Sequence, residues 1–430
     1  MRILAILGWM SALAAGMAAA QDGGSARNWP QFRGDGCRGL VADQDLPVKL
    51  GKETLAWSVP LPGNGSSSPV VWGDRLFVTS GDSKEETVTL VCLDALSGRT
   101  HWTQSVKTGS YHLHRMNHAA ATTPCISEDT VVLSWFDGAK NMNMLSGFTH
   151  AGEKRWTYAV GAFQGQHGPS LHPAVHEGRI VYAHLSQTGG RVGVLDARSG
   201  KELWDTPYPA PNLKTSYCTP LVRTRMSAEG PKKEVVVASM AIGVRGLDFE
   251  TGKELWALPD AFNHRCIISP VDVLAGSGAR DALITVGCKG NVFLAVRPPD
   301  VTAGKAEVVW NLKRSVPYVP TPVSDGKTAY VLSDGGVLNA LDPRSGDVRW
   351  TERLPGNFYA SPLLIGGKLY CKSREGEIFV AEVGERFKLL ATSDLKPGDE
   401  VAFADATPAV AHNSLYVRIG ARMDCYRTEP

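Results

Sequence analysis

The sequence predicts an all-β protein folded as an eight-bladed β-propeller, with the ring closed by the N-terminal strand joining the last blade. Two short phrases that recur along the 430 residues carry this prediction, and the two ends of the chain complement each other. Repetition at this spacing, with strand-like segments throughout, is typical of a propeller in which each repeat forms one four-stranded sheet.

The first phrase is an apolar strand ending at Asp, a Gly four residues later, and a Trp on the next strand. It is clearest from Leu195 to Trp204 and recurs from Leu93, Phe148, Leu247 and Leu341, with a degenerate copy from Ala295 to Trp310. The Asp carboxylate can accept a bond from the amide two residues on, and the Gly can adopt the left-handed conformation that closes a bulged hairpin. A Trp that recurs in successive repeats cannot serve a single ligand, so these side chains are predicted to pack between blades. They are Trp57, Trp102, Trp156, Trp204, Trp256, Trp310 and Trp350.

The second phrase is Ser or Thr followed by Pro, which opens an apolar run in each repeat. The pairs begin at Ser68, Thr123, Thr219, Ser269, Thr321, Ser361 and Thr407, and His172-Pro173 stands in for one of them. The eight openings lie about 40 to 55 residues apart, within the range of propeller repeats. They predict eight repeats of four strands.

The termini each look like part of one repeat. Residues 54–60, with Trp57, resemble the last strand of a repeat whose beginning is missing, and residues 414–419 and 422–427 form a repeat that lacks its Trp strand. Joining the two ends would close the ring and remove the exposed sheet edges of an open array.

Three segments are expected along the chain. Residues 1–20 have the positive start, short apolar stretch and small-residue end of a secretory signal peptide. Residues 21–51 form an N-terminal arm that packs on the propeller, because Trp29 and Phe32 need a place to be buried. Residues 52–430 form the single propeller. We therefore expect a periplasmic or secreted protein, and a monomer, with no membrane span.

The net charge of +2 and the absence of a Lys/Arg run give no electrostatic footprint for nucleic acid. The eight cysteines are scattered without a CxxC or an adjacent pair, so structural zinc and covalent haem are unsupported. Disulfides between some of them and buried free thiols both remain open.

The repeats resemble the tryptophan-docking repeats of the quinoprotein alcohol dehydrogenase-like superfamily. More closely, the whole mature chain resembles the PQQ-binding-like β-propeller repeat proteins of planctomycete-type bacteria, with further matches at residues 28–34, 114–124, 164–168 and 358–362. The superfamily holds both dehydrogenases and non-enzymatic scaffolds, so the resemblance implies the fold and leaves the activity open.

For an active quinoprotein, the resemblance implies a quinone held by Arg or Lys, a calcium ion and a catalytic Asp, and in the alcohol dehydrogenase branch an adjacent-cysteine disulfide. This chain lacks such a pair and is shorter than those enzymes, and Arg265, Lys214 and Asp405 match by residue type alone. We expect no cofactor, no catalytic residue and no metal, and keep PQQ with calcium as the alternative.

The candidate ligand site is the mouth of the central channel. The linker from each Trp strand to the next Ser/Thr-Pro pair should rim this mouth, and six of the eleven histidines fall in these linkers. The candidate residues are His114, Asn117, His118, Gln166, His167, Lys214, Tyr217, His264, Arg265, Tyr318, Tyr359 and Asp405. These groups either form a pocket for a small polar ligand or a peptide segment, or they satisfy backbone groups at the channel mouth.

The leading hypothesis is therefore an exported binding or protein-assembly scaffold that engages an unknown protein partner or small polar ligand at the channel mouth. The alternatives are a PQQ-dependent dehydrogenase that oxidises an alcohol or sugar, and a carbohydrate-binding propeller.

Overall fold

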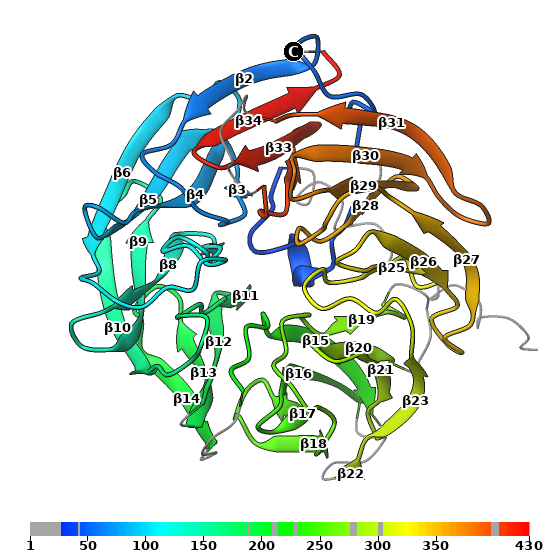
Figure 1. Ribbon diagram of the computed structural model, residues 1–430. Coiled ribbons are helices and arrows are strands. Elements are labelled where there is room, and N and C mark those ends of the chain that lie inside the picture. The colour runs from blue at the N-terminus through cyan, green and yellow to red at the C-terminus, as the bar shows by residue number, and fades with distance from the viewer. Residues whose placement is uncertain are drawn as a thin grey trace, which may run out of the picture.

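The computed structural model describes residues 27–41, 44–187, 189–208, 214–227, 230–275, 282–299, 304–396 and 404–429. The expected signal peptide, residues 1–20, lies outside the described residues. Eight separate β-sheets stand around a central axis as the blades of a propeller (Figure 1), which confirms the predicted fold class. Among the described residues, no helix has the length and apolar character needed to cross a membrane.

Each blade contains four antiparallel strands in radial order, the first nearest the axis. Blades 1 and 2 comprise β3 (Val70–Trp72), β4 (Arg75–Asp82), β5 (Thr87–Asp94) and β6 (Thr100–Lys107), then β7 (Cys125–Ile126), β8 (Thr130–Asp137), β9 (Met142–Thr149) and β10 (Lys154–Ala162). Blades 3 and 4 comprise β11 (Ala174–His176), β12 (Arg179–Ser186), β13 (Gly189–Asp196) and β14 (Glu202–Tyr208), then β15 (Leu221–Ser227), β16 (Gly230–Ser239), β17 (Gly243–Asp248) and β18 (Glu254–Leu258).

Blades 5 and 6 comprise β19 (Val271–Asp272), β20 (Ile284–Cys288), β21 (Val292–Arg297) and β23 (Glu307–Leu312), then β24 (Val323–Ser324), β25 (Ala329–Leu332), β26 (Val337–Leu341) and β27 (Val348–Arg353). Blade 7 comprises β28 (Leu363–Ile365), β29 (Lys368–Lys372), β30 (Glu377–Glu382) and β31 (Lys388–Asp394). Blade 8 comprises β32 (Ala409–Ala411), β33 (Ser414–Ile419), β34 (Arg422–Arg427) and β2 (Leu55–Pro60). Two short extra strands, β1 (Leu40–Val41) and β22 (Gly304–Lys305), add in parallel to blades 7 and 4.

The ring closes in blade 8. The N-terminal strand β2 pairs antiparallel with the C-terminal strand β34, with Trp57 opposite Cys425 (Figure 1). The predicted complementarity of the two chain ends is thus confirmed, and it ties the first and last repeats into one sheet.

The repeated tryptophans lock neighbouring blades together. Trp204 of β14 donates its indole N–H to the backbone oxygen of Phe249 in the next blade at 2.8 Å. Its ring also covers Gly252 of that turn, where a Cβ would lie 2.4 Å from the ring. Two features exclude a side chain at this turn position: the positive φ of +70° and the indole ring stacked against it. The same indole-to-carbonyl bond is made by Trp57, Trp102, Trp156, Trp310 and Trp350.

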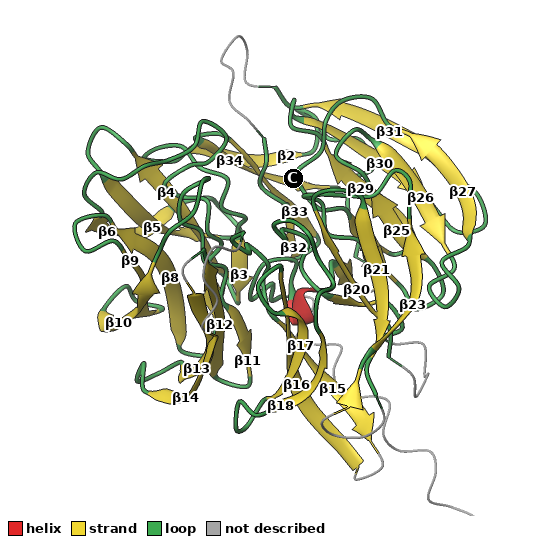
Figure 2. Ribbon diagram, turned by 60° about the horizontal axis from the view of Figure 1, so that its bottom comes forward, coloured by secondary structure: helices red, strands yellow, loops and turns green. Residues whose placement is uncertain are grey.

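Residues 27–41, the dark blue segment at the centre of the ring in Figure 1, touch the innermost strands of several blades, and their helical turn is the red element in Figure 2. Trp29 pairs with Val71 of blade 1, the oxygen of Pro30 accepts the amide of Ile126 in blade 2, and Gln31 accepts the amide of Val175 in blade 3. The short turn η1 (Asp35–Cys37) then leads into β1, which pairs with blade 7. This segment thus contacts blades 1, 2, 3 and 7 through their innermost strands.

Candidate ligand site at the channel mouth

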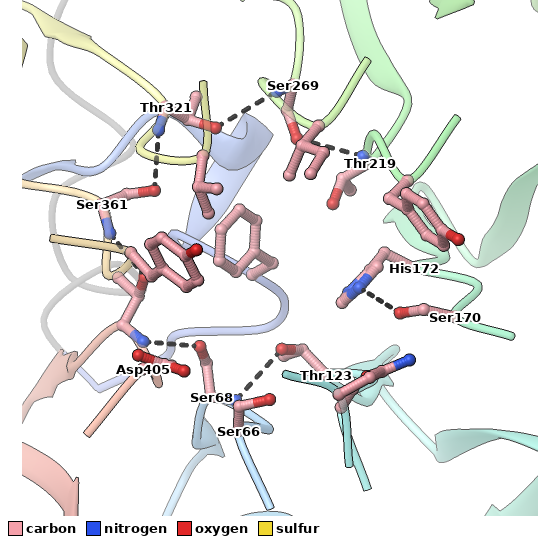
Figure 3. A pocket seen from close by; sticks show the side chains of 18 of the residues that line it. Ser66, Ser68, Thr123, Ser170, His172, Thr219, Ser269, Thr321, Ser361 and Asp405 are labelled. Atoms are coloured by element: carbon pink, nitrogen blue, oxygen red, sulfur yellow. Dashed lines mark hydrogen bonds between the residues drawn. The ribbon is translucent and has the colours of Figure 1, made fainter. Parts of the chain in front are cut away.

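The Ser/Thr-Pro pairs form a hydrogen-bonded crown around the axis (Figure 3). In six of the pairs, the backbone N–H of the Ser or Thr donates to the hydroxyl oxygen of the crown residue in the next blade, while the Pro has no N–H to donate. The bonds measure 2.9 to 3.1 Å and run from Thr219 to Ser269, Thr321, Ser361, Thr407, Ser68 and Thr123 in turn. The chain of bonds is interrupted at blade 3, where His172 replaces Ser or Thr and instead contacts Ser170 at 2.8 Å.

The crown surrounds a cavity of about 350 Å³ on the propeller axis. Phe32 of the N-terminal arm lines it together with the crown hydroxyls, and three tyrosines from different linkers, Tyr217, Tyr318 and Tyr359, add aromatic walls. A volume of this size lies within the range of small-molecule pockets, which are concave and mostly apolar with a few convergent polar groups.

One wall of the cavity is cationic. Arg265 is 5% exposed and donates to the hydroxyl of Tyr318 at 3.3 Å and to Oε1 of Gln166 at 2.8 Å, both neutral groups. Lys289, from the hairpin between β20 and β21, lies with its ammonium 5.7 Å from the centre of the Tyr318 ring. The amide of Lys289 donates to the oxygen of Arg265, which fixes the hairpin against the linker.

The carboxylate of the cavity is already engaged. Asp405 accepts from Nε and Nη2 of Arg374 at 2.7 and 3.2 Å, and the Arg374 guanidinium stacks 3.9 Å from the centre of the Tyr359 ring. A bidentate pair of this kind neutralises both side chains and holds them in one geometry. Asp405 therefore has little capacity left for a further cation.

Four histidines near the cavity have a pKa lowered by burial. Burial, followed by the charge of Arg265, lowers the pKa of His167 to about 4, and burial alone lowers the pKa of His172 to about 4. Burial also lowers the pKa of His118 and His264. The rings of His114 and His167 are in edge contact, 4.4 Å between centres.

Seven of the twelve candidate residues line the cavity: Asn117, His167, Tyr217, Arg265, Tyr318, Tyr359 and Asp405. Of the other five, Gln166 binds Arg265, and His114 contacts His167. His118, Lys214 and His264 do not line the cavity either. The linkers thus bring most of the candidates together, as their position between the Trp strands and the crown implies.

Several lining residues were not among the candidates. Lys289 lies on a hairpin between the two middle strands of blade 5, and these hairpins reach the mouth face as the linkers do. The crown residues were recognised only as markers of the repeat. Phe32 was expected to be buried by the arm, with no place assigned, and His172 was noted only as the variant of the repeat.

The residues present do not fit calcium. This ion takes six to eight oxygen ligands, usually including several carboxylates, whereas Asp405 lines the cavity with both of its oxygens bound to Arg374. Across the described residues, no three His, Cys, Asp or Glu side chains are grouped as metal ligands would be. All eight cysteines are described, and all are buried free thiols.

The fold and the axial cavity define a PQQ-type β-propeller. A model of the family described as outer membrane protein assembly factor BamB matches residues 48–228 and 244–386, and the chain belongs to this family. The chain is 24% identical over 249 residues to the outer membrane protein assembly factor BamB of Moranella endobia (strain PCIT), a match covering 53% of this chain and 58% of that relative.

Solved structures share the fold at low identity. BamB from Moraxella catarrhalis superposes with a TM-score of 0.58 and 14% identity over 87% of this chain and 99% of that one. A europium-containing methanol dehydrogenase superposes with a TM-score of 0.61 and 11% identity over 92% of this chain and 90% of that one. At these identities the likeness establishes the common propeller and says nothing of a common activity.

Proposed function

We propose that this protein is an exported, non-enzymatic scaffold that docks a partner protein on the mouth face of its propeller. Membership of the family described as outer membrane protein assembly factor supports a role exerted through protein contact in the periplasm. The closed ring, in which the described parts of the linkers lie on one face, suits such a role.

One observation carries the proposal, a basic sector of the mouth face. Its described residues are 214–218, 259–268, 288–292 and 313–320, and they hold one carboxylate, Asp260, and four cationic side chains that are not buried. The four cations are Lys214, Lys289, Lys313 and Arg314, whereas Arg265 of the same segments is buried in the cavity. The nearby Asp334, whose carboxylate accepts the amide of Tyr318 at 2.6 Å and whose pKa is raised by burial, adds a second carboxylate and leaves the sector with an excess of positive charge. Such an excess attracts a partner with an acidic surface and favours one orientation of it.

The test is site-specific photocrosslinking in the cells that make the protein. A photoreactive residue replaces Lys313 on the basic sector. In the matched control it replaces Ser199, which is exposed in the Asp-Gly turn of blade 3, on the face opposite the mouth. We expect one discrete crosslinked protein with an acidic surface from position 313 and none from position 199. The product should disappear when Arg314→Glu is added. Equal crosslinking from both positions, or a product indifferent to Arg314→Glu, would contradict the proposal.

A quinone-dependent dehydrogenase is the second candidate, since the methanol dehydrogenase shares the propeller. Arg265 and Lys289 suit the carboxylates of a quinone, but the donor set around Asp405 does not suit its calcium ion. We therefore expect no dye reduction above the protein-free rate when the purified protein is mixed with PQQ, calcium and an alcohol or sugar. Substrate-dependent turnover in that assay would establish the enzyme instead.

A further inference from the structure

The axial cavity contains a buried cation without an anionic partner. Arg265 is 95% buried by the protein and lines the cavity, and its two hydrogen-bond partners among the described residues, Tyr318 and Gln166, are both neutral. Burying a charge is costly unless it is paired. An arginine kept in this position is suited to a ligand that supplies the missing negative charge.

Among the described residues that line the cavity, no carboxylate is free to pair with Arg265. Lys289 stands on the same wall and adds a second positive charge. The carboxylate of Asp405 is paired with Arg374 on the other side of the cavity. The two charges that face the cavity without a carboxylate partner are therefore both positive, on adjacent segments of blade 5.

The crown adds neutral donors. Six hydroxyl oxygens, those of Ser68, Thr123, Ser269, Thr321, Ser361 and Thr407, each accept a backbone N–H. In the described part of the chain, none of the six donates its own proton to another residue. The proton of each of these hydroxyls is therefore free to be donated to a ligand. The crown is suited to a ligand that carries several oxygen acceptors.

Flat apolar surfaces complete the cavity. Phe32 lines it from the arm, and Tyr217 and Tyr318 line it from the linkers. The C–H face of a sugar ring suits such walls, while its ring hydroxyls suit the crown. The volume of about 350 Å³ limits the ligand to one or two sugar rings.

We propose that the axial cavity binds a sugar acid, with its carboxylate on Arg265 and Lys289 and its hydroxyls on the Ser/Thr crown. This inference goes beyond the docking function, because it concerns the cavity within the ring and needs no partner protein. The same chemistry occurs in a free uronate and in a uronate at the end of a polysaccharide chain.

The test is isothermal titration of the purified protein with D-glucuronate, D-glucose, acetate and an oligouronide. We expect saturable binding of glucuronate and weaker binding or none for the neutral sugar and for acetate, each of which lacks one of the two recognition elements. Tighter binding of the oligouronide than of glucuronate would assign the ligand to a polysaccharide end, and the reverse order to the free acid. Either order supports the site.

Variants connect the binding to the named residues. Arg265→Gln should weaken glucuronate binding by about tenfold to a hundredfold, the range expected for loss of a charge-assisted hydrogen bond. Lys289→Gln, at an exposed hairpin position where folding is not at risk, should weaken it by about twofold to fivefold. Lys201→Gln, an exposed cation at the opposite face and outside the cavity lining, is the matched control and should leave it unchanged.

Absence of saturable binding with about 10 mM glucuronate, which would fill most of even a millimolar site, would overturn the proposal. Glucose binding as tightly as glucuronate, or equal affinities in wild type and Lys289→Gln, would overturn it as well. The crosslinking test of the docking function uses different positions, so the two proposals fail separately.

Discussion

The indole nitrogen of Trp256 donates to Oε2 of Glu234 at 2.8 Å, a buried bond within its own blade. Each of the other repeated tryptophans donates to a backbone carbonyl in the turn before the last strand of the following blade. The described residues of blade 5 offer Trp256 no such carbonyl. An ion-pair network also joins blade 4 to blade 5. Arg223 binds Glu234, which is fully buried, and also Asp272 of blade 5 at 2.7 Å. At this boundary the network takes the place of the indole-to-carbonyl hydrogen bond, while the Trp256 ring still packs with apolar residues of blade 5 such as Ile284.

This arrangement predicts that Arg223→Met is strongly destabilising. It leaves the buried carboxylate of Glu234 short of a partner, and breaking a buried pair from one side costs about 3–5 kcal/mol. The matched control is Arg245→Met, which removes the more exposed pair with Glu254 and should cost less than about 1 kcal/mol. Urea unfolding of the two variants measures both effects, and similar losses of unfolding free energy would refute the role given to the network.

The contact between the turn glycines and the indoles is tested by Gly200→Ala. Gly200 has a φ of +68°, and a Cβ there would lie 2.5 Å from the Trp156 ring. Gly178 has a φ of +70° with open space around it, so Gly178→Ala reports backbone strain alone, about 1–2 kcal/mol. Gly200→Ala should lose a further 1–3 kcal/mol or so through overpacking. Thermal unfolding of both variants decides, and equal losses would show that the indole does not restrict the turn.

The crown is tested by the pair Thr321→Val and Thr321→Ser. Valine keeps the shape of threonine and removes the acceptor for the amide of Ser269, leaving a buried donor unsatisfied at a cost of about 1–3 kcal/mol. Serine keeps the acceptor and should cost less. Chemical unfolding gives the comparison. If serine were as damaging as valine, the methyl group rather than the hydrogen bond would be the stabilising element.

The low pKa of His172 predicts an acid-sensitive fold. Its pKa falls from an ordinary value of 6.5 to about 4, so the unfolded chain binds the proton at a higher pH than the folded protein does. The free energy of unfolding should therefore decrease as the pH falls from about 6.5 to about 4. His172→Gln should reduce the slope of the unfolding free energy against pH by up to about 1.4 kcal/mol per pH unit, the contribution of one bound proton. Urea unfolding across this range measures the slope, and an unchanged slope in the variant would contradict the assignment.

Much of the fold was predictable because each residue of the repeated sequence phrase has a structural role that recurs in every copy. Asp196, Gly200 and Trp204 each have a local reason for their identity, and the reasons recur with the phrase. The complementarity of residues 54–60 with the last repeat followed from counting strands. The exception at Trp256 was not predictable, since its partner Glu234 lies on a different strand and has no repeated position.

The candidate site was only partly predictable. Arg265 and Tyr318 were predictable because they lie in linkers between a Trp strand and the next Ser/Thr-Pro pair. The order of these elements along the chain is enough to place the linkers at the mouth. Lys289 was missed because only the linkers were considered. In a blade of four antiparallel strands, the hairpin between the two middle strands lies on the same face as the linkers, so the topology could have indicated this residue. Five of the crown bonds join residues 40 to 55 positions apart, and the sixth joins Thr407 to Ser68 across the closure of the ring. Each runs from a backbone amide to a side chain, and no local pattern reveals such a partner.

The central claim is that recognition is concentrated at the channel mouth. Hydrogen–deuterium exchange of the purified protein with and without saturating D-glucuronate tests it most directly. The account predicts slower exchange in residues 163–172, 259–268 and 313–320, with no change in the Asp-Gly turns at the opposite face, such as 196–200. Protection confined to those turns, or no protection at the mouth, would contradict it.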